Sequence, residues 1–223
     1  MIPPLPAFLR RGLLAALFCA AAQLSAAPEK WAAAITKFTT ADVKHPPPRD
    51  AVLFIGSSSI VKWTTLAKDF PGVTVINRGF GGSELADSVF YADRIVLPYQ
   101  PRTVVVYAGD NDLSAGKSPE TVAADFKAFR TKIHAALPTT KIVFIGIKPS
   151  PSRWPIRDQV RKANALIAAD CATDQQRLAF VDTWQPMLGP AGLPRPELYV
   201  ADQLHLTPAG YAVWRPLVAL LLK

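Results

Sequence analysis

Five short apolar runs recur along the chain and predict the strands of a buried sheet. They cover residues 51–55, 73–76, 103–107, 141–147 and 178–181. The runs contain many β-branched and aromatic residues and lack the alternation of a half-exposed strand, which is typical of strands covered on both faces. The longer segments between them space their apolar residues three or four positions apart and predict helices.

The helix-like segments alternate with the strands. The clearest covers residues 118–137, because Ser118 can cap it and Pro119 suits its first turn. Further helices are expected over residues 31–43, 83–96, 156–172 and 207–222. Strands that alternate with helices form right-handed crossovers and a parallel sheet. The expected fold class is therefore α/β, with a five-stranded parallel sheet in a three-layer α/β/α arrangement.

The first residues have the pattern of a secretory signal. Arg10 and Arg11 precede an apolar run over residues 13–22, and small residues follow at 25–27. The run is shorter than the roughly twenty apolar residues that a membrane span needs. An uncleaved anchor or a buried N-terminal helix is the alternative. We expect a signal peptide over residues 1–27, an N-terminal helix with a proline-rich linker over 28–50, and one folded domain over 51–223.

Composition narrows the classes of partner. Without residues 1–27 the chain keeps 23 basic and 17 acidic residues, so its net charge falls from +8 to +6. The basic residues are scattered, and no nucleic-acid-binding motif is present, so we expect a solvated surface and no nucleic-acid partner. Cys171 would be the one remaining cysteine, which excludes an internal disulfide. Neither a metal-ligand spacing nor a phosphate-binding loop is present, and no metal or cofactor is expected.

Polar and glycine-rich segments follow three of the predicted strands directly. They are Ser57-Ser58-Ser59, the segment 78–82, and Gly109-Asp110-Asn111-Asp112. Each alone could be a helix cap or an ordinary turn. Parallel sheets, however, place ligand sites at the carboxyl ends of their strands, so we expect these segments to converge.

A carboxylate and an imidazole stand close together near the end of the chain. Asp202 lies three residues before His205, in a turn that precedes the last predicted helix. The carboxylate can orient the imidazole through one ring nitrogen, which leaves the other free to take a proton from a serine. His45 lies in the proline linker and His134 on the polar face of a helix, so His205 is the histidine suited to this role. Together these residues predict a serine hydrolase.

The four segments resemble the conserved blocks of the SGNH, or GDSL-like, hydrolase family. The similarity extends over about residues 52–222. It implies that Ser58 is the nucleophile, that Asp202 and His205 complete a catalytic triad, and that the Ser58 amide forms an oxyanion hole with Gly82 and Asn111. The family's usual aspartate before the nucleophile is a serine here, at position 57. The neighbouring serines at 57 and 59 are therefore alternative nucleophiles; otherwise we interpret them as helix-capping hydroxyls.

The resemblance implies a cofactor-free serine esterase with a flavodoxin-like domain, and the signal pattern of residues 1–27 predicts that it is exported, periplasmic or secreted. The chain resembles platelet-activating-factor acetylhydrolase-like and lysophospholipase-like esterases of this family, so the substrate would be a small-molecule, glycan or lipid ester. The compact length, without an obvious lid insertion, favours short acyl chains. An acyltransferase with the same triad and a non-catalytic ligand-binding protein on the same scaffold are the alternatives. Arg78, Arg153 and Trp154 are candidate substrate-binding residues. The two arginines could equally form structural ion pairs.

Overall fold

A five-stranded parallel sheet forms the centre of the molecule. The computed structural model describes residues 28–222, and its strands are β1 (Val52–Gly56), β2 (Val75–Gly79), β3 (Thr103–Tyr107), β4 (Lys141–Ile145) and β5 (Leu178–Val181). Their order across the sheet is β2-β1-β3-β4-β5, and every neighbouring pair is parallel. The predicted α/β class and the five strands are confirmed.

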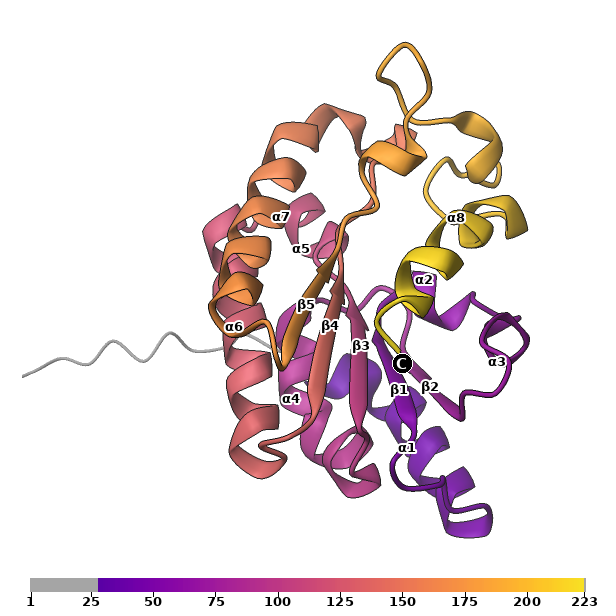
Figure 1. Cartoon of the computed structure of the whole chain (residues 1–223), viewed down its shortest axis with the longest axis vertical. Helices are drawn as coiled ribbons and strands as arrows, with labels where there is room; N and C mark the ends of the chain where they lie inside the picture. Colours follow the sequence, from indigo (N-terminus) through magenta and orange to yellow (C-terminus); the bar gives the residue numbers. More distant parts are fainter. Residues whose placement is uncertain (1–27, 223) are drawn as a thin grey trace, which may run out of the picture.

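Helices cover both faces of the sheet (Figure 1). The longer ones are α1 (Pro28–Lys44), α4 (Leu85–Ile95), α6 (Pro119–Ala136), α7 (Arg157–Cys171) and α8 (Pro208–Ala219). The short ones are α2 (Ser58–Val61), α3 (Leu66–Asp69) and α5 (Asp110–Ser114). The apolar spacing predicted the longer helices but missed the short ones, because a single turn is too short to show a period.

The two faces of the sheet carry separate hydrophobic clusters. On β3, Val104 and Val106 pack toward α4, α6 and α7, whereas Val105 and Tyr107 pack toward α2, α3 and α8. Figure 1 shows these two groups of helices on opposite sides of the sheet. Because successive side chains of a strand point to opposite faces, a strand covered on both sides must be apolar throughout. This explains the continuous apolar runs.

Helix α1 joins the same core as the sheet. Its Ile35 is fully buried, and Trp31 and Phe38 pack beside it. An ion pair of 2.6 Å between Asp42 of α1 and Arg78 of β2 adds a polar tie. Helix α1 is therefore packed against the domain, and the proline-rich linker connects it to β1. The predicted signal peptide, residues 1–27, lies outside the described residues.

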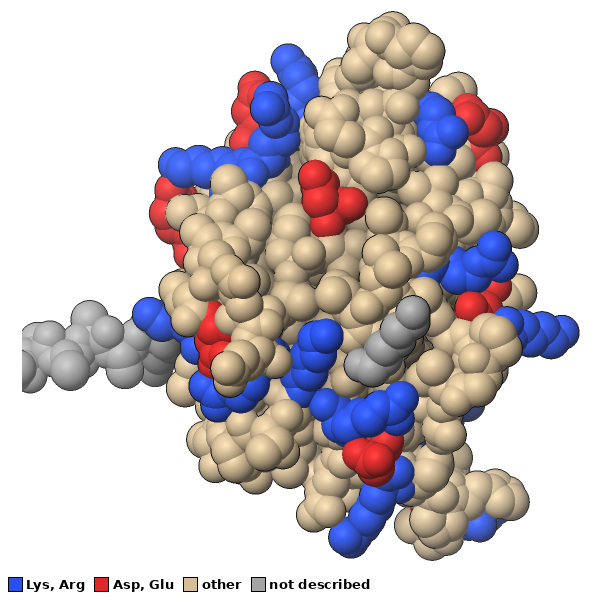
Figure 2. All heavy atoms as spheres, in the orientation of Figure 1, with Lys and Arg blue, Asp and Glu red and all other residues tan. Residues whose placement is uncertain are grey.

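The described surface mixes charges of both signs. Figure 2 shows lysine and arginine side chains scattered among acidic ones over the face seen in Figure 1. None of the helices in residues 28–222 combines the length and the apolar character that crossing a bilayer requires. Cys171 is a free, buried thiol whose pKa is raised to about 12 by burial. A thiol of this kind is an unreactive core residue.

Candidate active site

The turn after β1 presents Ser58 at the edge of the sheet. Gly56 ends the strand with a φ of 128°, and a Cβ there would lie 1.9 Å from the carbonyl oxygen of Tyr107, so a side chain has no room. Ser58 is the first residue of α2. The hydroxyl of Ser57 is buried and makes no capping bond to α2, so the interpretation of Ser57 as a hydroxyl cap is wrong. Ser59 also does not cap a helix; its Oγ accepts from Lys148.

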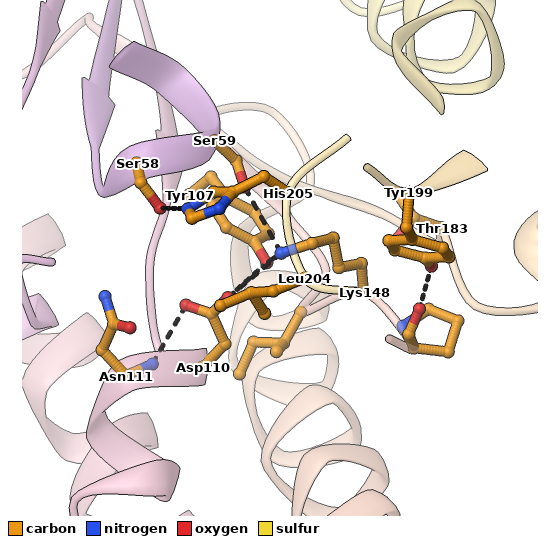
Figure 3. Close-up of polar contacts among 12 residues, drawn as sticks. Ser58, Ser59, Tyr107, Asp110, Asn111, Lys148, Thr183, Tyr199, Leu204 and His205 are labelled. Atoms are coloured by element: carbon orange, nitrogen blue, oxygen red, sulfur yellow. Dashed lines mark hydrogen bonds and ion pairs between the residues drawn. The ribbon is translucent and has the colours of Figure 1, made fainter. Parts of the chain in front are cut away.

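A chain of two hydrogen bonds joins Ser58, His205 and Asp202. The Ser58 Oγ lies 2.8 Å from His205 Nε2, and His205 Nδ1 lies 2.5 Å from Asp202 Oδ2 (Figure 3 shows the first of these bonds). Because a carboxylate only accepts, Nδ1 carries the proton of the neutral ring and Nε2 accepts from the serine hydroxyl. The structure thus brings together three residues from opposite ends of the chain in the geometry of an activated nucleophile.

The turn that carries His205 is organised by Asp202. Its Oδ1 accepts the backbone amides of Leu204 and His205, each at 2.9 Å. Gln203 adopts a φ of 57°, which tightens this turn. The hydrogen bond from the His205 side chain lowers the pKa of Asp202, despite the opposing effect of burial, so the carboxylate is ionised at neutral pH.

Two further loops approach the turn that bears Ser58. A Cβ placed on Gly81 would lie 3.7 Å from the Ser58 Cβ, so the loop after β2 adjoins the nucleophile turn. Asn111, at the start of α5, donates from Nδ2 to the carbonyl oxygen of Ser83 at 3.0 Å, which ties the loop after β3 to the loop after β2. Figure 3 shows the Asn111 side chain pointing toward the Ser58 turn. Gly82 lies in the loop after β2, with a φ of 75°.

Comparison with known proteins places this geometry in a family. The model of the GDSL-like Lipase/Acylhydrolase family matches residues 55–213. The chain belongs to this family. The matched segment contains the Ser58, Gly82, Asn111, Asp202 and His205 positions. No curated protein sequence matches the chain.

Solved structures of several bacterial proteins are similar to this fold. A candidate platelet activating factor from Streptococcus pneumonia superposes with a TM-score of 0.77 at 18% identity, over 87% of this chain and 94% of its own. A GDSL-like lipase from Bacteroides thetaiotaomicron VPI-5482 gives 0.70 at 22% identity, over 84% and 96%. An acetylxylan esterase mutant from Geobacillus stearothermophilus gives 0.61 at 15% identity, over 79% and 95%. The GDSL-like fold thus persists at low identity.

A buried charged cluster lies beside the hydrogen-bonded chain of Ser58, His205 and Asp202 in this GDSL-like protein. Lys148 follows β4, and its Nζ lies 2.8 Å from the Tyr107 hydroxyl, 3.1 Å from Asp110 Oδ2 and 3.3 Å from Ser59 Oγ. Burial opposes the ionisation of Asp110, but the ammonium of Lys148 outweighs it and lowers the pKa of this carboxyl. This cluster was not among the predicted site residues. A lysine directly after a buried strand was the available signal.

The structure separates the two candidate substrate-binding arginines. Arg78 is turned toward α1, where its guanidinium bonds Asp42 and the Tyr99 hydroxyl. These contacts support the alternative of a structural ion pair at this position. Arg153 instead lies close enough to Asp110 for its charge to contribute to the lowered pKa of that carboxyl. Its buried Nε has no hydrogen-bond partner among the described residues, so its role in substrate binding stays a prediction.

A cavity of about 460 Å³ opens beside the histidine turn. It is lined by Pro151, Trp154, Leu193, Pro194, Pro196, Tyr199 and Gln203. Most of these side chains are apolar, and Trp154 stacks on Trp184 with 6.0 Å between the ring centroids. Gln203 belongs to the turn that carries Asp202 and His205, and it is the residue through which the cavity meets that turn. In residues 28–222 no group of three His, Cys, Asp or Glu residues could hold a metal ion.

Proposed function

We propose that the protein hydrolyses carboxylic esters with Ser58 as nucleophile, His205 as general base and Asp202 as the orienting acid. The observation that carries this proposal is the continuous hydrogen-bonded chain from the Ser58 hydroxyl through both ring nitrogens of His205 to the Asp202 carboxylate. Membership of the GDSL-like lipase/acylhydrolase family supports an acyl ester as the substrate.

The reaction begins when Ser58 Oγ attacks the ester carbonyl carbon while His205 Nε2 takes the hydroxyl proton. The tetrahedral intermediate then breaks its bond to the alcohol oxygen, and His205 returns the proton to the departing alkoxide. Water attacks the acyl-serine in the same way, with His205 again as the base. The second collapse releases the carboxylic acid and restores the hydroxyl of Ser58.

The negative oxygen of the intermediate needs donors that are in place before the reaction. We assign three: the backbone amide of Ser58, the backbone amide of Gly82 and the side-chain amide of Asn111. The Ser58 amide is at the first position of α2, where a helix has no internal acceptor for it. One Nδ2 hydrogen of Asn111 bonds Ser83, which fixes the side chain and leaves the second hydrogen for substrate.

The cavity beside the histidine turn supports an ester with a compact apolar group. Its volume of about 460 Å³ and its lining of proline, leucine and aromatic side chains suit a short acyl chain or a flat ring. The acetylxylan esterase with a similar fold acts, by its description, on acetylated xylan. We therefore propose short-chain acyl esters, acetyl esters included, as the substrates.

We also propose that the protein is exported to the periplasm or secreted after removal of residues 1–27. The support is the sequence of this segment, in which two arginines precede an apolar run that ends in small residues. N-terminal sequencing of the protein from culture medium and from the periplasmic fraction tests this. A chain that retains Met1 in the cytoplasm would contradict it.

The assignment of Ser58 is tested by single-serine variants. Ser58→Ala should abolish turnover of a p-nitrophenyl ester series from acetate to palmitate and also labelling by a fluorophosphonate. Ser57→Ala is the matched control, because its hydroxyl is buried and unbonded among the described residues. Normal turnover by the Ser58→Ala variant would refute the assignment, and an unlabelled, inactive wild-type protein would favour a binding function.

A further inference from the structure

We propose that Lys148 is a positioning residue. It holds three turns at fixed distances from one another: the turn that carries Ser58, the turn that carries Asn111 and the turn that carries His205. The inference rests on the proposed function, because it assigns a task to a residue that need not touch the substrate. Lys148 lies three residues after the end of β4 and is 2% exposed. A lysine is rarely buried to this extent unless its charge is paired. The hydrogen-bond partners of Lys148 come from the ends of two other strands, β1 and β3.

Each proton of the Lys148 ammonium has an acceptor. The three acceptors are the Tyr107 hydroxyl, the Asp110 carboxylate and the Ser59 hydroxyl, at 2.8, 3.1 and 3.3 Å (Figure 3). The Tyr107 hydroxyl accepts from Lys148 and in turn donates to Asp110 at 3.1 Å. An ammonium has three donors and no acceptor, so this set satisfies it completely. The ammonium at the tip of the side chain is therefore held in one position.

The ammonium binds directly to sequence neighbours of two proposed catalytic residues, Ser58 and Asn111. Ser59 is the residue after the nucleophile, and Asp110 is the residue before Asn111. Asp110 accepts the backbone amide of Asn111 with its other oxygen, Oδ1, at 3.0 Å, which fixes the start of α5. The distance between the Ser58 turn and the Asn111 turn is thus set through one charged side chain.

The residues after Lys148 hold the histidine turn. The carbonyl oxygen of Pro149 accepts the hydroxyl of Tyr199, and the amide of Ser152 donates to the carbonyl oxygen of Gln203 at 3.1 Å. Gln203 lies between Asp202 and His205. The segment that begins with Lys148 therefore contacts all three turns from which the proposed catalytic groups project.

Stability alone does not account for this cluster. A buried ion pair costs desolvation of both partners, and apolar residues of similar size often give an equally stable core. Removing one partner is harmful because it leaves an uncompensated buried charge, whereas removing both charges avoids that penalty. This difference separates a positioning role from a purely structural one.

The test compares Lys148→Met with the double variant Lys148→Met/Asp110→Asn. The single variant should lose both thermal stability and kcat for p-nitrophenyl acetate. The double variant has no unpaired charge, so its unfolding temperature should recover most of the loss. Its kcat should stay down by about 100-fold while KM changes little, because a small misplacement of reacting groups has an effect of this order. The rate of fluorophosphonate labelling should fall in parallel.

Arg130→Met is the matched control. It removes the cation of the partly buried pair between Arg130 of α6 and Asp170 of α7, and it should lower stability without lowering kcat. Recovery of wild-type kcat in the double variant would overturn the positioning role of Lys148 and leave the esterase proposal intact. Absence of turnover and labelling in the wild-type protein would overturn the proposed function and, with it, this inference.

Discussion

Asp202 performs two tasks at the scale of a single residue. One carboxylate oxygen accepts two backbone amides of its own turn, and the other holds the ring of His205. The spacing of three residues makes both contacts available to one side chain, so the turn and the orientation of the imidazole form together. The hydrogen bond from His205 lowers the pKa of Asp202, which keeps the acceptor charged at neutral pH.

Asp202→Asn should separate these two tasks. The amide oxygen of asparagine can still accept the amides of Leu204 and His205, so the turn and the unfolding temperature should be nearly unchanged. The neutral side chain no longer selects the ring tautomer that leaves Nε2 free, and kcat should fall by about 10,000-fold. Steady-state kinetics with p-nitrophenyl acetate, beside thermal unfolding, measures both effects. A kcat within tenfold of wild type would contradict the role of Asp202.

Asn111→Ala removes one proposed oxyanion donor. Losing such a donor costs about 100- to 1,000-fold in kcat, and KM should change much less because the donor acts mainly in the transition state. The bond from Asn111 to the Ser83 carbonyl is also lost, so a small drop in unfolding temperature should accompany the change. A rise in KM with an unchanged kcat would instead place Asn111 in ground-state binding.

At the scale of elements, α1 lies against the loop after β2 that contains Gly82, although α1 precedes the matched family segment, residues 55–213. A Cβ on Gly82 would lie 3.1 Å from the Trp31 ring, and the same ring packs edge-on against Phe80 with 5.9 Å between centroids. Gly82 already has a φ of 75°, a conformation that glycine adopts easily. Glycine makes this loop conformation accessible, and packing against Trp31 helps to hold the loop in it.

Trp31→Ala should lower kcat several-fold and reduce stability by roughly 1–3 kcal/mol, because the indole is partly buried. Phe38→Ala is the matched control on the same helix: Phe38 packs on Arg78, with the guanidinium 5.0 Å from the ring centroid. It should reduce stability without a comparable loss of kcat. Chemical denaturation and ester kinetics on both variants test this. Equal losses of kcat would show that α1 acts only through global stability.

Asp112 links α5 to the start of α4 by accepting the Leu85 amide at 3.2 Å. Burial raises the pKa of Asp112 to about 7, and Lys117 offsets this only partly because it also pairs with Glu84 and Asp125. The ordinary value is 3.8, so the folded protein binds this proton more tightly than the unfolded chain. The contribution of Asp112 to the free energy of unfolding is therefore fully present below about pH 4 and is lost as the pH rises through about 7.

Asp112→Asn should therefore gain stability relative to wild type as the pH rises from 5 to 8, by an amount on the order of a few kcal/mol. Asn keeps an acceptor for the Leu85 amide but cannot ionise. Asp125→Asn is the control, since it also removes a carboxylate from Lys117. Thermal unfolding across this pH range gives the difference. A constant difference between Asp112→Asn and wild type would show that Asp112 does not titrate there.

At the scale of the whole molecule, the proposed substrate cavity combines the segment after β4, the loop before α8 and the histidine turn. Trp154→Ala opens one wall and should raise KM several-fold for p-nitrophenyl butyrate, while kcat changes little. Acetate, which has less apolar surface to bury, should be affected less. Initial-rate measurements with both esters provide the comparison. An equal change in KM for the two would place the acyl group outside this cavity.

The pattern of the sequence was sufficient for the α/β class and for the pairing of Asp202 with His205, whereas the choice of Ser58 among three adjacent serines rested on the resemblance to the GDSL-like family. The apolar runs predicted all five strands, and the spacing of Asp202 and His205 predicted a turn in which one orients the other. The short helices α2 and α5 were missed because one turn shows no period. The position of Arg78 after an apolar run also did not show whether it binds substrate or forms an ion pair, because its partner Asp42 lies on α1.

The alternation of strands and helices and the kinds of polar group at the strand ends follow from the order of the residues, because local periodicity and turn chemistry depend on neighbours along the chain. Which of those groups meet depends instead on how the strands pack together. Lys148, Asp110, Tyr107 and Ser59 carry no common motif, and they contact one another because β1, β3 and β4 lie side by side and end at the same edge. Contacts of that kind are set by the order and register of strands, which the hydrophobic pattern of each strand does not specify.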